Sequence, residues 1–137
     1  GDDKIKNTNL ILCFAGAILI PVTLFGENRS HNASFILDTG ASGIIIDHSI
    51  VFDLGYSARE GHGFSVVSSA IGKEKGYRLV IRGMETLGRK MNNIEVHCHD
   101  LKNQGVEGLL GMAFLKYFDW CIHPSQRIIS VGKSFII

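Results

Sequence analysis

Short apolar segments separated by glycine and polar residues run through most of this chain. Segments of this length and spacing predict the strands of an all-β sandwich or barrel. Two of them, residues 77–82 and 94–97, alternate between apolar and polar side chains, which predicts sheets with one solvent-exposed face. The predicted strands cover residues 11–15, 18–25, 33–37, 43–47, 63–70, 76–81, 93–99, 120–123 and 127–131.

Helical periodicity is confined to two places. Residues 111–118 place Met112, Leu115 and Phe118 on one side, which predicts a short C-terminal helix of about two turns. Residues 48–54 predict one further helical turn.

The composition is that of one globular domain. Of 137 residues, 45% are hydrophobic and 20% are charged, and there is no tandem repeat or low-complexity tract. We expect a loosely held N-terminal segment at residues 1–9 and one domain at residues 10–137. The net charge is +1 with Lys and Arg scattered along the chain, so nucleic acid is not an expected partner.

The cysteines suggest buried thiols rather than a disulfide framework. Cys13, Cys98 and Cys121 are odd in number and have no CxxC spacing. A metal site at residues 97–99 is disfavoured because His97 and His99 point to one face of a strand while Cys98 points to the other. We therefore expect no metal and no cofactor.

Residues 10–20 form an apolar run that resembles the start of a secretory signal or a membrane anchor. About 11 residues are too few to span a bilayer, which needs about 20, so stable membrane insertion of this chain is not expected. The sequence does not fix the cellular compartment. One alternative is a bacterial cell-envelope location, and another is membrane association of a longer precursor.

The strongest chemical signal is the triplet Asp38-Thr39-Gly40, which follows the apolar residues 35–37. A carboxylate activates water well when a second carboxylate lies close enough to share a proton, one acting as base and the other as acid. The triplet occurs once in the chain. The second carboxylate must then come from another copy, which predicts a homodimer.

About seventy residues later, Gly108, Leu109, Leu110 and Gly111 form a buried-strand pattern that ends in glycine. Together the two segments resemble the retropepsin-like aspartic peptidases, most of all their bacterial single-domain members, over roughly residues 18–131. The resemblance implies a closed retropepsin-like β-barrel or sandwich with a flap hairpin and one short C-terminal helix. It also implies that the Gly108–Leu110 segment and Gly111 support the catalytic loop.

The resemblance assigns roles around the triplet. Asp38 would share the proton, Thr39 would bond across the dimer axis to the partner loop, and Gly40 would bind substrate main chain. Ala41 and Ser42 would contact substrate. Ala41 lacks the hydroxyl that stabilises the ionised aspartate in two-domain relatives. The pKa of the two Asp38 carboxyl groups should therefore be higher than that of the pair in pepsin.

A polar hairpin between the two motifs matches the family's flap, which closes over substrate. Ala70, Ile71 and Gly72 are the predicted substrate contacts, with residues 73–76 as the alternative tip. Viral relatives carry an acidic residue at the position of Ser42 and an arginine at that of Met112, and neither is present here.

These features predict an aspartic endopeptidase that acts on a peptide or protein substrate as a homodimer. The alternative is a peptide-binding or dimerisation module on the same fold with little turnover, because fold does not imply function.

Overall fold

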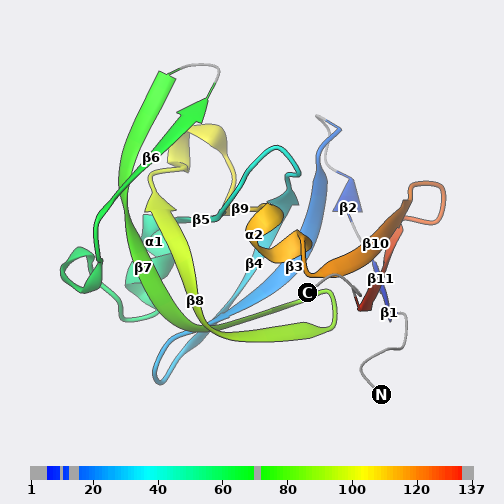
Figure 1. The fold of residues 1–137 in the computed structure, drawn as a ribbon, viewed down its shortest axis with the longest axis horizontal. Helices are drawn as coiled ribbons and strands as arrows, with labels where there is room; N and C mark the ends of the chain where they lie inside the picture. The colour runs from blue at the N-terminus through cyan, green and yellow to red at the C-terminus, as the bar shows by residue number, and fades with distance from the viewer. Residues whose placement is uncertain (1–5, 10, 13–15, 70–71, 134–137) are drawn as a thin grey trace.

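The computed structural model describes residues 6–9, 11–12, 16–69 and 72–133 (Figure 1). Strands dominate this part of the chain, as the sequence predicts. In order the elements are β1 Lys6–Asn9, β2 Ile11–Leu12, β3 Ile18–Phe25, β4 Ser30–Leu37, β5 Ile44–Asp47, helix α1 His48–Asp53, 3-10 turn η1 Ala58–Glu60, β6 Phe64–Ser69, β7 Gly72–Thr86, β8 Arg89–His99, 3-10 turn η2 Lys102–Gln104, β9 Gly108–Leu110, helix α2 Met112–Leu115, β10 Phe118–His123 and β11 Ile128–Lys133.

Six strands of the larger, eight-stranded sheet close into a barrel. The strand order of that sheet is β2-β3-β4-β9-β5-β8-β7-β6, and β3 pairs a second time, with β7. The register of that closing pair runs from Val22 opposite Thr86 to Phe25 opposite Gly83. The predicted closed β-barrel is therefore confirmed.

Strand β3 shows how the sequence specifies the barrel. Ile20, Val22 and Leu24 alternate with more exposed residues and are buried inside. One edge of β3 pairs with β2 at its start and with β7 from Val22 onward. Pro21, which has no N–H to donate, lies between these two ladders, and its carbonyl accepts a bond from the Thr86 hydroxyl at 2.8 Å.

The hydrophobic core joins the barrel strands to both helices and to β11 of the smaller sheet. Its largest fully buried side chains include Phe35 of β4 and Phe114 of α2. Helix α2 is a single turn, shorter than the two turns predicted, because the chain already extends into β10 at Phe118. The predicted inward face was also wrong at Met112, which is 37% exposed while Phe114 and Leu115 are buried.

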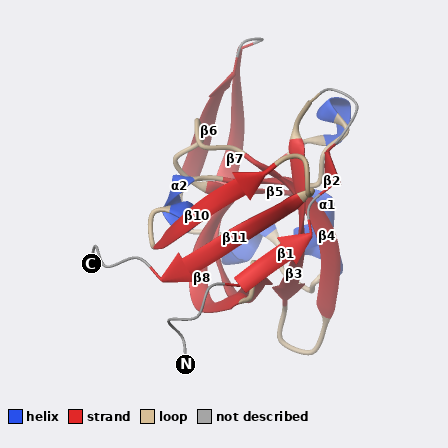
Figure 2. Ribbon diagram, turned by 90° about the vertical axis from the view of Figure 1, so that its right-hand side faces the viewer, coloured by secondary structure: helices blue, strands red, loops and turns tan. Residues whose placement is uncertain are grey.

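A second, three-stranded sheet has the order β1-β11-β10 and faces the viewer in Figure 2. Strand β1 pairs with β11 from Lys6 opposite Val131 to Asn9 opposite Ile128. Part of the N-terminal segment that the sequence suggested to be loosely held is therefore strand.

Strands β7 and β8 are longer than predicted. They meet at Leu87 and Gly88, whose φ values of 54° and 74° give a tight two-residue hairpin turn. At its other end β7 pairs with β6, and this β6–β7 hairpin projects beyond the rest of the sheet in both views (Figures 1 and 2). Among the described helices, none has the length and apolarity needed to cross a membrane.

Candidate active site

The loop that carries Asp38 begins where β4 ends. Strand β4 runs parallel to β9, with Leu37 opposite Leu110. Directly after this pair, the Asp38 N–H donates to the Leu110 carbonyl oxygen at 3.0 Å. The Gly40 N–H donates to Asp38 Oδ1 at 2.9 Å. The sheet thus fixes the backbone of Asp38, and the turn to Gly40 fixes its carboxylate.

Strand β9 lies between the two ends of this loop. It pairs with β4 before the loop and antiparallel with β5 after it, where Ile44 lies opposite Leu110. Gly108 cannot carry a side chain, because a Cβ there would lie 2.5 Å from the Phe35 ring and 2.7 Å from the Ile45 carbonyl oxygen. The predicted supporting segment therefore lies directly against the predicted catalytic loop.

The start of α2 fastens the loop further. The Met112 N–H donates to the Ala41 carbonyl oxygen at 2.8 Å, and the Ala113 N–H donates to that of Ser42 at 2.7 Å. Gly111 allows this approach, since a Cβ there would lie 2.3 Å from the Gly43 carbonyl oxygen. Two backbone bonds and one close contact between glycines fix the conformation of the loop.

The outer side of the loop is open in the single chain. Thr39, Gly40 and Ser42 are exposed, and Asp38 and Ala41 are half-buried. Asp38 is the only carboxylate between β4 and β5 up to Asp47, which ends β5. Asp38 therefore lies among exposed residues on the outer side of the loop.

The β6–β7 hairpin corresponds to the predicted flap. Its ladder continues to the pair Ser69 and Gly72, so residues 73–76 lie within β7 rather than at the tip. Ala70 and Ile71, two of the predicted substrate contacts, lie outside the described residues. Gly72 begins β7.

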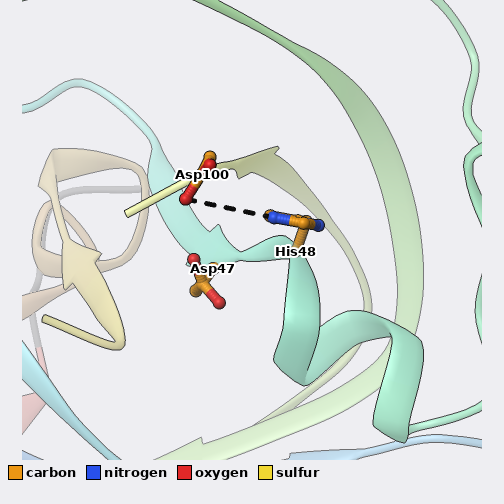
Figure 3. Close-up of side chains that lie close together, drawn as sticks. All are labelled: Asp47, His48 and Asp100. Carbon is orange, nitrogen blue, oxygen red and sulfur yellow. Dashed lines mark ion pairs between the residues drawn. The ribbon is translucent and has the colours of Figure 1, made fainter. Parts of the chain in front are cut away.

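A second cluster of ionisable side chains lies at the other end of β9. Asp47, His48 and Asp100 each offer an atom within 4.8 Å of the others (Figure 3). They line a hollow of about 750 Å³, whose other charged or ionisable lining groups include His31, Lys102 and Glu107. The Asp47 N–H donates to the Glu107 carbonyl oxygen at 2.9 Å, whereas Asp38 binds the opposite end of the same strand.

Asp47 is occupied by structural hydrogen bonds. Its Oδ1 accepts from the Leu101 N–H at 2.8 Å, and its Oδ2 accepts from the N–H and the hydroxyl of Ser49, which starts α1. Burial raises the pKa of Asp47, but the bonds from Ser49 and Leu101 outweigh it and leave the pKa below 3.8. These contacts explain the buried carboxylate as an anchor between α1 and the segment after β8.

The structure also brings His97 against the loop that carries Asp38, a contact that the sequence did not predict. A Cβ at Gly43 would lie 2.9 Å from His97 Cδ2 and 3.1 Å from Nε2, so the imidazole packs on the end of the loop. The pKa of His97 lies below its ordinary value of 6.5, chiefly because burial disfavours the charged ring. Arg78 lowers the pKa further, and Glu95 opposes the shift. The alternation of residues 94–97 could have placed His97 on the outer face, but nothing in the sequence indicated that Gly43 lies beside it.

The barrel, the Asp-Thr-Gly loop and the glycine-bounded strand beside it are the features of the retropepsin-like aspartic protease fold. The chain matches the family model described as aspartyl protease over residues 20–114, and it belongs to that family.

Solved structures agree on the fold. A retropepsin-like aspartic protease from Rickettsia conorii superimposes with a TM-score of 0.67 at 22% identity, covering 93% of this chain and 99% of that one. The EIAV protease complexed with the inhibitor HBY-793 gives a TM-score of 0.53 at 16% identity, covering 73% of this chain and 84% of that one. A search of curated proteins finds no significant match.

Proposed function

We propose that this protein is an aspartic endopeptidase that hydrolyses peptide bonds as a homodimer, with water held between Asp38 of each chain. The observation that carries the proposal is the position of Asp38 in an exposed loop. Its N–H donates to the Leu110 carbonyl oxygen, and its carboxylate accepts from the Gly40 N–H. One such carboxylate is half of an acid–base pair, and a two-fold axis through the loop would supply the other half.

The chemistry needs no covalent intermediate. With one proton shared between the two carboxylates, the ionised Asp38 takes a proton from water as the water attacks the peptide carbonyl. The protonated Asp38 of the partner chain stabilises the developing oxyanion and supplies the proton that the leaving amine requires. The two residues exchange roles by symmetry.

Neighbouring residues would organise this dyad. Thr39, which is exposed in one chain, would bond across the axis to the backbone of the partner loop. Gly40 would offer its carbonyl to substrate main chain, with Ala41 and Ser42 beside it. The β6–β7 hairpin would close over the peptide, which supports Gly72 and the predicted tip residues Ala70 and Ile71 as contacts.

Substitution of Asp38 tests the proposal. Asp38→Asn is nearly isosteric but cannot share a proton, so it should abolish cleavage of a mixed peptide library in mild acid and leave stability nearly unchanged. Asp119→Asn, at an exposed carboxylate of β10, is the matched control and should keep full activity.

Two outcomes would count against the proposal. Wild-type turnover by a clean preparation of the Asp38→Asn variant would show that another group is the base. Peptide binding without cleavage by the wild type would favour the binding-module alternative.

A further inference from the structure

Backbone pairing places five residues in one row across the outer face of the barrel. Ile36 of β4 lies opposite Leu109 of β9, Leu109 opposite Ile45 of β5, Ile45 opposite His97 of β8, and His97 opposite Arg78 of β7. Directly paired residues project from the same face of a sheet. The row therefore begins with apolar side chains and ends with ionisable ones.

Asp38 lies on the same face as this row. It follows Ile36 by two residues, and its N–H still bonds the neighbouring strand, so its side chain projects in the direction of Ile36. Ile36 and Leu109 are half-buried and do not belong to the core cluster. The His97 ring touches Gly43 at the far end of the catalytic loop. The loop thus connects the carboxylate with the ionisable end of the row.

The ionisable end is a cluster of four side chains from three segments. His62 Nε2 lies 3.0 Å from Glu95 Oε2, and Arg78 Nη1 lies 3.8 Å from Glu95 Oε1. Glu95 and His97 are two residues apart on β8, and the Arg78 backbone bonds those of His62 and Gly63 in both directions. The side chains of His62, Arg78 and Glu95 are all partly exposed.

Charge favours an anion at this cluster. Glu95 is its only acid, and both carboxylate oxygens already face a basic group. Arg78 is a permanent cation, and His62 and His97 add positive charge when they are protonated. Arginine has several N–H donors, so Arg78 can bond a carboxylate of a ligand as well as Glu95.

Distance places the cluster within reach of a bound peptide. Ile36 and His97 are three strand spacings apart, roughly 14 Å, which an extended peptide covers in about four residues. We propose that the cluster of His62, Arg78, Glu95 and His97 is a specificity subsite that selects an acidic substrate side chain a few residues from the scissile bond. This inference rests on the proposed peptidase function.

Competing peptides test the subsite. Each of the four positions on either side of the scissile bond is occupied in turn by Glu, Gln or Lys, and kcat/KM is measured for every peptide in mild acid. At one of these positions the wild type should prefer Glu over Gln by about tenfold, the ratio that one charge-assisted hydrogen bond provides.

Substitutions of Arg78 and of Glu95 should change the Glu-to-Gln ratio in opposite directions. Arg78→Gln should reduce the Glu-to-Gln ratio to about one, and Arg78→Lys should restore part of it. Glu95→Gln should raise the ratio, because it removes the competing anion. Arg82→Gln is the matched control, since Arg82 follows on the same face of β7 but pairs with Glu27 at 3.4 Å, and it should leave the ratio unchanged.

Each outcome decides between the two claims. Cleavage with equal kcat/KM for Glu and Gln at every position would refute the subsite and leave the peptidase standing. A fall in the ratio for both Arg78→Gln and Glu95→Gln would also refute it, since that pattern reflects general disruption. No cleavage of any peptide by the wild type would refute the proposed function, and the subsite with it.

Discussion

Gly111→Ala should destabilise the protein through a single added methyl group. The Cβ would lie 2.3 Å from the Gly43 carbonyl oxygen and 2.5 Å from that of Ala41. The backbone itself is not the obstacle, since Gly111 has φ −102° and ψ −167°, which any residue adopts. The clash must instead push the Asp38 loop away from the start of α2.

The size of the effect follows from what that movement breaks. Forcing one extra carbon into a packed site costs about 1–3 kcal/mol. The two bonds that join Met112 and Ala113 to the loop contribute about 0.5–1.5 kcal/mol each. We expect a loss of about 2–6 kcal/mol in the free energy of unfolding, a large share of the roughly 5–15 kcal/mol of a typical domain.

Urea unfolding measures this loss directly. At about 2 kcal/mol per molar urea, the midpoint should fall by about 1–3 M. Gly105→Ala is the control: Gly105 has φ 67° and no atom within 4 Å of a Cβ, so its substitution carries only the cost of the left-handed backbone, about 1–2 kcal/mol. A Gly111→Ala midpoint within error of the wild type would refute the close packing of loop and helix.

Two further predictions concern pH. The pKa of Asp47 lies below 3.8, so the stabilisation by its hydrogen bonds is present above that value and is lost as pH falls through the folded pKa. Asp47→Asn should therefore cost about 1–3 kcal/mol in urea unfolding at neutral pH and much less at about pH 2, and equal costs would contradict the anchor role. Peptide cleavage should show a bell-shaped kcat/KM profile with its maximum at roughly pH 4 to 6, whereas an optimum near about pH 9 would indicate a different base.

Hydrophobic alternation and turn residues predicted most of the barrel. Strand β3 was predicted with its observed bounds, because three buried aliphatic residues alternate along it and glycine follows its end. The approach of the Gly108–Leu110 strand to Asp38 could be expected only from the resemblance, since no local pattern reveals which distant strands pair.

The errors have physical causes. The turn between β7 and β8 was missed because Leu87 adopts a positive φ that a leucine seldom takes, and no Asn-Gly pair marks it. The predicted strands stopped at residue 81 and started at residue 93, yet β7 continues through Gly83, which fits a close contact with the Met91 carbonyl. Strand β8 begins earlier, and Asn93, at φ 52°, interrupts the ladder without shifting its register.

Elements held by tertiary pairing were also missed. Strand β1 is polar and short, and its pairing with β11, more than a hundred residues away in sequence, is what makes it a strand. The cluster around His97 depends in the same way on residues from β7, β8 and the segment before β6. Sequence position alone could not bring these side chains together.

The central claim is that two chains build one active site, and mixing chains tests it most directly. Wild-type and Asp38→Asn chains are exchanged in equal amounts, exchange is verified by mass, and peptide cleavage is measured. Random pairing leaves about a quarter of two-fold dimers with two carboxylates, so activity per wild-type chain should fall to about one half. Unchanged activity per wild-type chain would show that the site lies within one chain and would contradict the shared dyad.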